Sequence, residues 1–204
     1  MKIHDVQQGT EAWLRARAGI PTASQFDKII TPKTRKLSSQ ADKYAMQLLA
    51  ERILGRPLED TKSFYWAERG KQLEDEARLW YEGTRNVDTQ PIGFVTNDAG
   101  TIGASPDRLV GDDGLLEIKC PAPHTHMGYL LGDPVSQDYH LQVTGQLWIS
   151  ERSWCDVCSY HPELPTAVIR VERNEKDIAM LAELIGEFAL QVERLRAQYR
   201  ERGL

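Results

Sequence analysis

The sequence predicts a mixed α/β domain in which helices flank a small central twisted β-sheet. Two observations lead to this prediction. Apolar residues recur at helical spacing in the first half and at the end of the chain, and at a period of two in short segments between them. The resulting order of helices, strands, a helix, further strands and a last helix is typical of a mixed domain. Because neither a repeat nor a flexible linker interrupts this order, residues 1–204 are expected to form a single domain.

The helical period predicts four helices in the first half of the chain, over residues 11–18, 24–30, 40–54 and 64–82. The third helix has a start and a stop signal. Ser39 and Asp42 have the spacing of a capping box, and Gly55 is typical of the residue that follows a helix. The fourth helix is expected to end before Gly83.

The apolar period then changes to two, which predicts antiparallel strands over residues 91–97, 101–110 and 115–119. The remaining elements are predicted as a helix over 137–150, strands over 154–160 and 166–172, and a helix over 175–202. In the helix over 137–150, Tyr139, Gln142 and Gln146 share one face, whereas Leu141, Gly145 and Trp148 are expected on the packed side.

Composition excludes several classes of protein. The hydrophobic fraction of 41% and the charged fraction of 27% are near the globular average, which excludes a mainly disordered chain. Since the sequence contains neither an apolar run of roughly 18 residues nor a signal-peptide pattern, we expect a cytoplasmic protein without membrane contact. The net charge of −5 excludes a simple basic nucleic-acid coat, but a metal bound by carboxylates would reverse the sign locally.

Three cysteines are too few for a disulfide framework. Cys155 and Cys158 have a spacing that suggests zinc or redox chemistry. They are three residues apart in a predicted strand, however, and should point to opposite faces, which disfavours a shared metal.

Two predicted strands carry two acidic residues and a lysine, and these strands give the clearest indication of a catalytic site. Glu117 and Lys119 share one face of their strand, while Leu116 and Ile118 face the core. The direction of Asp107 depends on the turn that joins the strands. A two-residue turn pairs Asp107 with Ile118, on the wrong face. A three-residue loop over residues 112–114 pairs it with Lys119, diagonal to Glu117.

The three-residue loop is preferred because Gly114 would supply the left-handed residue at its end. Pro106 predicts a bend or bulge in the first strand. Two converging carboxylates suit Mg²⁺, or Mn²⁺, and a neighbouring lysine can orient or deprotonate a metal-bound water. This set fits hydrolysis of a phosphodiester. The same pattern also fits an ion pair on a solvated sheet face.

The Pro-Asp pair, followed after about ten residues by Glu-x-Lys, is similar to the signature of the restriction-endonuclease-like nuclease superfamily. Four blocks, in the same order, resemble lambda exonuclease and the YqaJ-type viral recombinases. These blocks are Gln8-Gly9-Thr10-Glu11-Ala12-Trp13-Leu14-Arg15-Ala16-Arg17-Ala18-Gly19 with Thr22-Ala23-Ser24, Gly70-Lys71-Gln72-Leu73-Glu74-Asp75-Glu76-Ala77, Glu117-Ile118-Lys119-Cys120-Pro121, and Tyr139-His140-Leu141-Gln142-Val143-Thr144-Gly145-Gln146-Leu147-Trp148.

The resemblance implies a restriction-endonuclease-like core and a Mg²⁺-dependent exonuclease that uses two metals. Such an enzyme degrades one strand of linear double-stranded DNA from the 5′ end, releases mononucleotides and leaves a 3′ overhang. The resemblance further implies a homotrimer around the DNA and a single-strand annealing protein as partner in recombination. A phage or prophage product in the bacterial host cytoplasm is the corresponding expectation.

The resemblance also assigns roles to the strand pair and to one helix residue. Asp107 and Glu117 would be metal ligands, together with the Ile118 carbonyl. Glu74 would support a metal or its water, and Lys119 would position the attacking water. Without the resemblance, Glu74 is more simply interpreted as a solvated helix carboxylate.

A second group of residues would bind the DNA. Arg17 and Ser24 would hold the 5′-terminal phosphate with help from Ser105, and Gln142 would lie near the scissile phosphate with Tyr139 close by. The guanidinium group is well suited to phosphate.

Each of these assignments competes with other interpretations. Arg17 could instead pair with Glu11 or Asp5 on the surface. An endonuclease of the same superfamily and a non-catalytic DNA-binding module are the competing functions.

Overall fold

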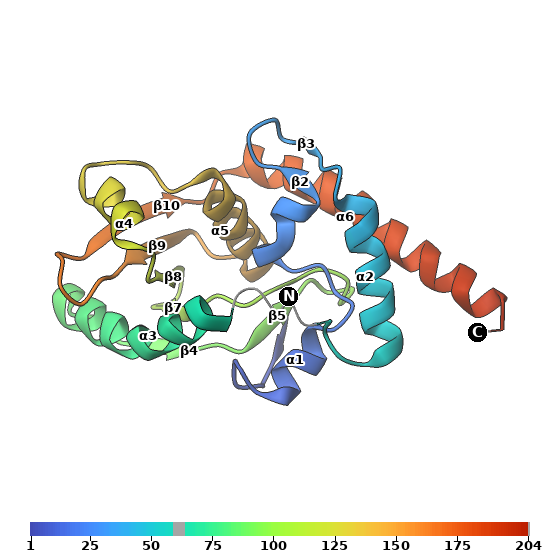
Figure 1. Cartoon of the computed structure of the whole chain (residues 1–204), viewed down its shortest axis with the longest axis horizontal. Coiled ribbons are helices and arrows are strands. Elements are labelled where there is room, and N and C mark those ends of the chain that lie inside the picture. Colours follow the sequence, from blue (N-terminus) through green and yellow to red (C-terminus); the bar gives the residue numbers. More distant parts are fainter. Residues whose placement is uncertain (59–63, 204) are drawn as a thin grey trace.

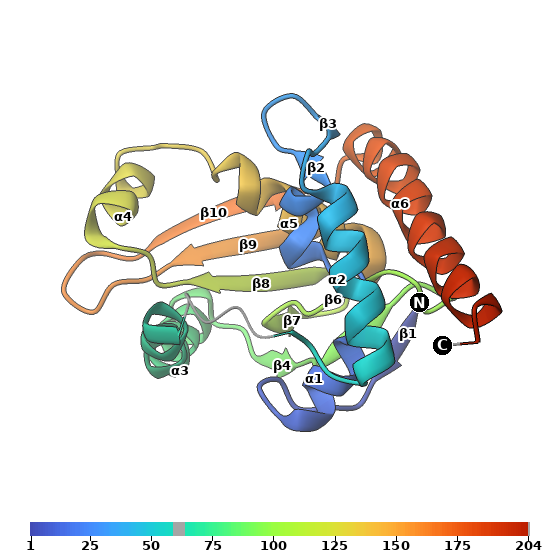
Figure 2. The same ribbon diagram turned by 45° about the vertical axis from the view of Figure 1, so that its right-hand side comes forward.

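A five-stranded sheet forms the centre of the computed structural model, which describes the backbone of residues 1–58 and 64–203 and, within these ranges, all side chains except those of residues 64–72, 137 and 138. Its strand order is β10-β9-β8-β7-β4. The bounds are β4 (Thr89–Pro91), β7 (Arg108–Val110), β8 (Gly114–Lys119), β9 (Trp154–Ser159) and β10 (Ala167–Glu172). The longest three strands run side by side in Figure 2.

Helices cover both faces of this sheet. The helix α3 (Phe64–Arg85) packs Ala77 and Tyr81 against Leu116 on one face, and α5 (Gln137–Ser150) packs Leu147 against Leu115 on the other. Figure 1 shows these helices around the sheet, with α2 (Ala41–Leu54) and α6 (Glu175–Glu201) beside each other farther along the molecule. The predicted mixed α/β fold is confirmed.

The antiparallel pairing predicted for the strands between residues 91 and 119 is confirmed, since β5 (Phe94–Thr96) pairs with β6 (Gly103–Ala104) and β7 with β8 in antiparallel register. The strands β8 and β9 run parallel, with Gly114 opposite Trp154 and Lys119 opposite Ser159. A parallel pair needs a crossover connection. Here α5 provides it together with α4 (Pro123–Leu130), a short helix that is not predicted from the sequence. Only two side chains of α4 are buried, His126 and Tyr129, so it lacks a recognisable apolar stripe.

The two strands predicted over 91–97 and 101–110 are each divided between two sheets. The parts next to the connecting loop, β5 and β6, join β1 (Lys2–His4) in a three-stranded sheet. The parts farther from that loop belong to β4 and β7 of the five-stranded sheet. The bend predicted at Pro106 is therefore confirmed. Gln8 stabilises this bend, because its Nε2 donates to the carbonyl oxygens of Ile92 at 2.9 Å and Pro106 at 2.8 Å.

The first helices carry residues of interest and begin close to their predicted positions. They are α1 (Glu11–Arg17) and the 3₁₀ helix η1 (Ala23–Lys28), which is followed by the hairpin strands β2 (Ile30–Thr31) and β3 (Lys36–Leu37). The capping box at Ser39 is wrong, since Gln40 occupies the N-cap position without a side-chain cap. The helix α2 does end at Gly55, which is left-handed with φ 64°.

The helix α3 continues to Arg85, beyond the predicted end at Gly83. Asn86, with φ 53°, adopts the left-handed conformation after the last turn instead. The later elements agree with prediction within one or two residues, and the helix over 137–150 agrees at both ends. None of the described helices is long and apolar enough to cross a membrane.

Gly145 lets α5 approach η1 closely. A Cβ at this position would lie 2.5 Å from Cε2 of Phe26, a fully buried side chain, and 3.0 Å from Cβ of Ala23. We expect Gly145→Ala to lower the free energy of unfolding by about 1–2 kcal/mol, because overpacking outweighs the helix propensity of alanine. Gly186→Ala on α6, where nothing lies within 4 Å, should instead raise it by up to about 1 kcal/mol.

Denaturant unfolding of both alanine variants would measure this difference. Equal changes for Gly145→Ala and Gly186→Ala would contradict the close approach of α5 and η1.

Candidate active site

The register of β7 and β8 brings two carboxylates together. Val110 pairs with Gly114 and Arg108 with Leu116, so the connecting loop covers residues 111–113, one residue earlier than predicted. Continuing this register by one residue places Asp107 opposite Glu117, and the predicted pairing of Asp107 with Lys119 is wrong.

Two glycines explain the shift of the loop. Gly111, with φ +54°, supplies the left-handed residue at the start of the loop, whereas Gly114 lies in β8. A Cβ on Gly114 would lie 2.2 Å from Cζ2 of the Trp154 ring. Gly114 therefore accommodates a neighbouring strand, and its sequence position alone does not reveal this role.

Asp107 caps the free edge of β8. Strand pairing of β7 stops at Arg108, and beyond it the Asp107 Oδ2 accepts a hydrogen bond of 2.6 Å from the backbone N–H of Ile118. Because the N–H and C=O of one strand residue point to the same side, the Ile118 carbonyl also faces Asp107. The predicted association of Asp107 with the Ile118 carbonyl is consistent with this geometry.

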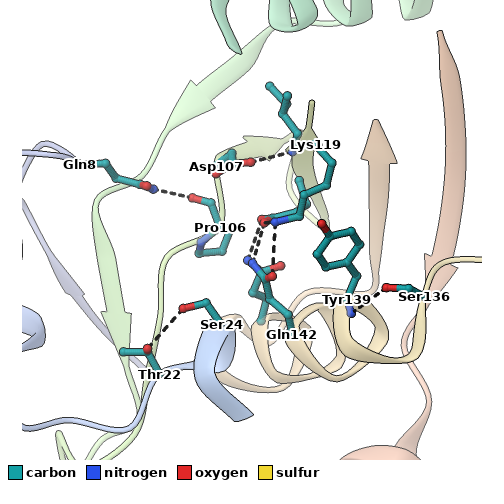
Figure 3. A network of polar contacts seen from close by, with 12 residues as sticks. Gln8, Thr22, Ser24, Pro106, Asp107, Lys119, Ser136, Tyr139 and Gln142 are labelled. Atoms are coloured by element: carbon teal, nitrogen blue, oxygen red, sulfur yellow. Dashed lines mark hydrogen bonds and ion pairs between the residues drawn. The ribbon is translucent and has the colours of Figure 1, made fainter. Parts of the chain in front are cut away.

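Glu117 is a buried carboxylate with charged and amide partners. The residue is 2% exposed, and Oε1 accepts from Lys119 Nζ at 2.7 Å and Gln142 Nε2 at 2.6 Å. Oε2 accepts from Gln146 Nε2 at 2.7 Å. The Lys119 ammonium also lies 4.8 Å from the centre of the Tyr139 ring. Figure 3 shows Tyr139 and Gln142 directed from α5 toward Lys119.

These contacts confirm that Tyr139, Gln142 and Gln146 share one face of α5 and that this face is directed at the acid–lysine pair. The interpretation of Glu117 and Lys119 as a solvated surface pair is wrong, because the glutamate is buried.

Burial and neighbouring charges shift the pKa values of Asp107 and Lys119. Burial raises the pKa of Asp107 well above its usual range, and repulsion from Glu117 and Glu74 adds to the rise. For Lys119, burial favours the neutral form, but attraction by Glu117 and Asp107 outweighs it and raises the pKa above its usual value. Lys119 therefore keeps its proton, which favours orienting a water over deprotonating it.

Glu74 approaches the same place from α3. It is half-buried and lines a cavity of about 440 Å³ together with Asp107 and Gln8. The structure thus brings Glu74 to the strand pair, as the family resemblance implies, and excludes the fully solvated alternative.

The donor set fits a hard divalent cation. Buried Asp107 is destabilised by neighbouring negative charge that a cation would offset, and the Ile118 carbonyl faces the same side. Within the described part of the chain, no group of three or more His, Cys, Asp or Glu side chains could hold a metal ion. A cation here would therefore need backbone oxygen and water ligands as well, which is usual for Mg²⁺.

A second cluster surrounds Arg17 at the end of α1. Its Nη1 donates to Ser105 Oγ at 2.9 Å, and its Nη2 lies 3.4 Å from Ser24 Oγ and from Thr22 Oγ1. Figure 3 shows Ser24 and Thr22 next to each other. The three residues predicted to bind a phosphate are thus brought together. Burial lowers the pKa of Arg17 to about 10, which still leaves it charged at neutral pH.

The alternative surface pairing of Arg17 is not found among the described residues, since Glu11 pairs with Arg15 at 2.5 Å. Trp13 precedes Arg17 by one helical turn, but the sequence alone predicts no role for it. The Arg17 guanidinium lies 4.2 Å from the centre of its ring, and Trp13 Nε1 donates to Ser105 Oγ at 3.1 Å. Trp13 thereby holds both Arg17 and Ser105.

Cys155 and Cys158 of β9 face opposite sides of the sheet, as predicted. Cys155 packs with residues on the α5 side and Cys158 with residues on the α3 side. Burial raises the pKa of both thiols, to about 12 for Cys158. Both are therefore expected to behave as inert core residues.

Comparisons with known proteins give consistent similarities. The model of the family described as YqaJ-like viral recombinase domain matches residues 12–153. Uncharacterized protein R354 of Acanthamoeba polyphaga mimivirus is 27% identical over 172 residues. This match covers 76% of the chain but only 29% of the viral protein, so the chain spans less than a third of that relative's length.

Solved structures match over nearly the whole chain. The alkaline exonuclease LHK-Exo from Laribacter hongkongensis is 28% identical with a TM-score of 0.78, over 94% of this chain and 99% of that one. Its complex with dAMP has a TM-score of 0.77 at 30% identity over the same shares. A phage-related exonuclease from Haemophilus somnus 129PT, with 14% identity, is similar in fold alone, with a TM-score of 0.69 over 88% and 96%.

Proposed function

The chain belongs to the YqaJ-like viral recombinase domain family, and from this membership and the geometry of the site we propose that it is a metal-dependent 5′–3′ exonuclease. In this proposal the enzyme acts on linear double-stranded DNA with two Mg²⁺ ions, or Mn²⁺, releases mononucleotides and leaves a 3′ single-stranded overhang. The structural relative LHK-Exo is an alkaline exonuclease, and it has also been crystallised with dAMP, a nucleoside monophosphate.

The observation that carries the proposal is the segment Ser105-Pro106-Asp107. Ser105 belongs to the Arg17 cluster and Asp107 to the carboxylate pair, so Pro106 alone separates the two in the chain. Two residues span at most roughly 7 Å, the scale of one nucleotide. An end phosphate held by Arg17 therefore leaves the next phosphodiester near Asp107, which favours release of single nucleotides from the 5′ end.

Different residues of the site would bind the DNA end and orient the reacting groups. Arg17, Ser24 and Ser105 hold the end phosphate. Lys119, kept charged and fixed by Glu117, orients the attacking water or the phosphate oxygens. A bound divalent cation would neutralise charge on the attacking and leaving oxygens.

Further residues would place that cation and the substrate. Asp107, Glu117 and the Ile118 carbonyl would hold the metal, and Glu74 would support the metal or its water. Gln142 would lie beside the scissile phosphate, with Tyr139 packing on Lys119.

The proposal extends to partners by family membership. We propose a homotrimer around DNA that acts with a single-strand annealing protein in recombination, as a phage or prophage product in the bacterial cytoplasm.

A digestion assay tests the activity. Linear duplex DNA labelled at the 5′ or 3′ end of one strand, with or without 5′-phosphate, is incubated with Mg²⁺, and closed circular DNA serves as control. The proposal predicts labelled mononucleotides from the 5′ end, faster with phosphate, and an intact circle. Cutting of the circle would favour the endonuclease, and DNA binding without cleavage would favour the non-catalytic module.

The Arg17 cluster gives a selective prediction. Arg17→Ala should slow digestion of 5′-phosphorylated ends by about 10–100-fold and change 5′-hydroxyl ends much less, because it removes charge-assisted hydrogen bonds worth about 1.5–3 kcal/mol. Arg15→Ala, on the same helix but paired with Glu11 at the surface, is the matched control and should leave both rates unchanged. An equal loss on both kinds of end would exclude the end-phosphate role.

A further inference from the structure

We propose that Gln146 is a positioning residue that holds the Glu117 carboxylate in the orientation needed to bind the metal, and that the metal binds Oε2 of Glu117. This inference rests on the proposed function, because it concerns the same site. Among the described residues, the Gln146 side chain forms its hydrogen bond with Glu117 alone, so it acts on the site through that carboxylate.

The geometry of α5 places two amides on one carboxylate. Gln142 and Gln146 are one helical turn apart, and each donates through Nε2 to a different oxygen of Glu117, at 2.6 Å and 2.7 Å. Because both donors come from one helix, they fix the rotation of the carboxylate about its last bond. Gln146 is the deeper of the two, with only 1% of its side chain exposed.

Counting acceptor positions identifies the oxygen that remains open. An ionised carboxylate offers about four lone-pair positions, two on each oxygen. Among the described residues, Oε1 accepts from both Lys119 and Gln142, whereas Oε2 accepts from Gln146 alone. Counted over the described side chains, one acceptor position remains, on Oε2, and a hard cation prefers an oxygen of this kind. Without Gln146 the carboxylate could rotate, and the open position would no longer be fixed.

The amide oxygen of Gln146 indicates that this residue is present for the hydrogen bond that it donates to Glu117. This oxygen, Oε1, is buried and has no hydrogen-bond partner among the described residues. An unpaired buried acceptor destabilises the folded protein, so the presence of the amide is not explained by its oxygen. Its contribution lies in the N–H donated to Glu117, because hydrogen bonds to ionised groups are stronger than those between neutral groups.

Metal titration of three proteins tests the inference. The wild type, Gln146→Met and the matched control Ser150→Ala are titrated with Mn²⁺ in the absence of DNA, and free Mn²⁺ is measured by electron paramagnetic resonance. Ser150 is a buried polar residue on the same helix whose Oγ donates to the Gln146 carbonyl oxygen of the backbone, not to Glu117.

We expect Gln146→Met to weaken Mn²⁺ affinity by about 10–100-fold, the usual effect of removing a residue that orients a metal ligand. Ser150→Ala should keep the wild-type affinity. Gln146→Asn, which keeps an amide but is one methylene too short to reach Glu117, should resemble Gln146→Met and provides the test if the methionine variant does not fold.

Other outcomes would overturn the inference. Unchanged Mn²⁺ affinity in Gln146→Met or Gln146→Asn would do so, as would an equal loss in Ser150→Ala, which would indicate a general disturbance of α5. A wild type that binds no Mn²⁺ would overturn both this inference and the metal-dependent mechanism. Expected affinities together with absent DNA digestion would support the role of Gln146 and reject the proposed activity.

Discussion

Replacing Asp107 with Asn is expected to stabilise the metal-free protein while reducing DNA digestion by about a thousand-fold or more. The loss of activity follows because the cation would lose a ligand, and the charge stabilisation it supplies amounts to several kcal/mol. The gain in stability follows because the asparagine side chain has no charge to bury and none for Glu117 and Glu74 to repel. Its amide oxygen can still accept the hydrogen bond from the Ile118 N–H, so the end of β7 stays in place.

The same carboxyl group predicts how stability depends on pH. The pKa of Asp107 is raised in the folded state, so above its unfolded value, about 4, the folded protein still holds a proton that the unfolded chain has released. The metal-free wild type should therefore lose stability as the pH rises from about 4 through the raised pKa. Asp107→Asn removes this contribution, and Mg²⁺ should reduce it in the wild type.

Thermal unfolding at several pH values, with Mg²⁺ or with a chelator, measures both effects. The wild type should gain stability from Mg²⁺ at neutral pH, and Asp107→Asn should gain little. A variant less stable than the wild type in chelator at neutral pH would contradict the assigned repulsion.

Replacing Lys119 with Ala is expected to reduce cleavage by about a thousand-fold and to leave DNA binding largely intact. The ammonium group lies beside the carboxylates, held 2.7 Å from Glu117 and 3.3 Å from the Gln142 amide oxygen. Removal of a preorganised charge from a catalytic site costs about 10²–10³-fold or more in turnover. Arg17 and its hydroxyl partners are untouched, so the DNA end should still bind.

Single-turnover digestion and fluorescence anisotropy with Ca²⁺ in place of Mg²⁺ would separate cleavage from binding. Lys43→Ala, at an exposed position of α2, is the matched control and should behave as the wild type. Undiminished cleavage by Lys119→Ala would reject the mechanism. A parallel loss of binding and cleavage would indicate that Lys119 binds DNA without orienting the reaction.

Much of the site could be predicted from residue spacing alone. Glu117 and Lys119 are two residues apart in a strand and must share a face, while Tyr139, Gln142 and Gln146 must share a face of one helix. Ser105 and Asp107 are likewise close because only Pro106 separates them in the sequence. Pro106 also predicts that the strand is interrupted between them. Local geometry decides such relations, and the structure confirms them.

Relations between segments could not be predicted in this way. The position of the loop before β8 depends on Trp154, whose ring occupies the space beside Gly114 and comes from a strand 40 residues later in the chain. A shift of this loop by one residue along the chain moves the partner of Asp107 from Lys119 to Glu117, two residues away on the same face of β8. The crossover that joins the parallel strands β8 and β9 includes α4, which has too few buried side chains to be recognised from the sequence.

The sequence by itself determined which chemical groups are available and which of them share a strand or helix face, because those faces follow from backbone geometry. Only the tertiary structure decided that Asp107 lies opposite Glu117, that two glutamines of α5 hold that glutamate, and that Trp13 holds Arg17 against Ser105. These contacts join residues far apart in the chain, and side-chain packing between strands and helices selects them.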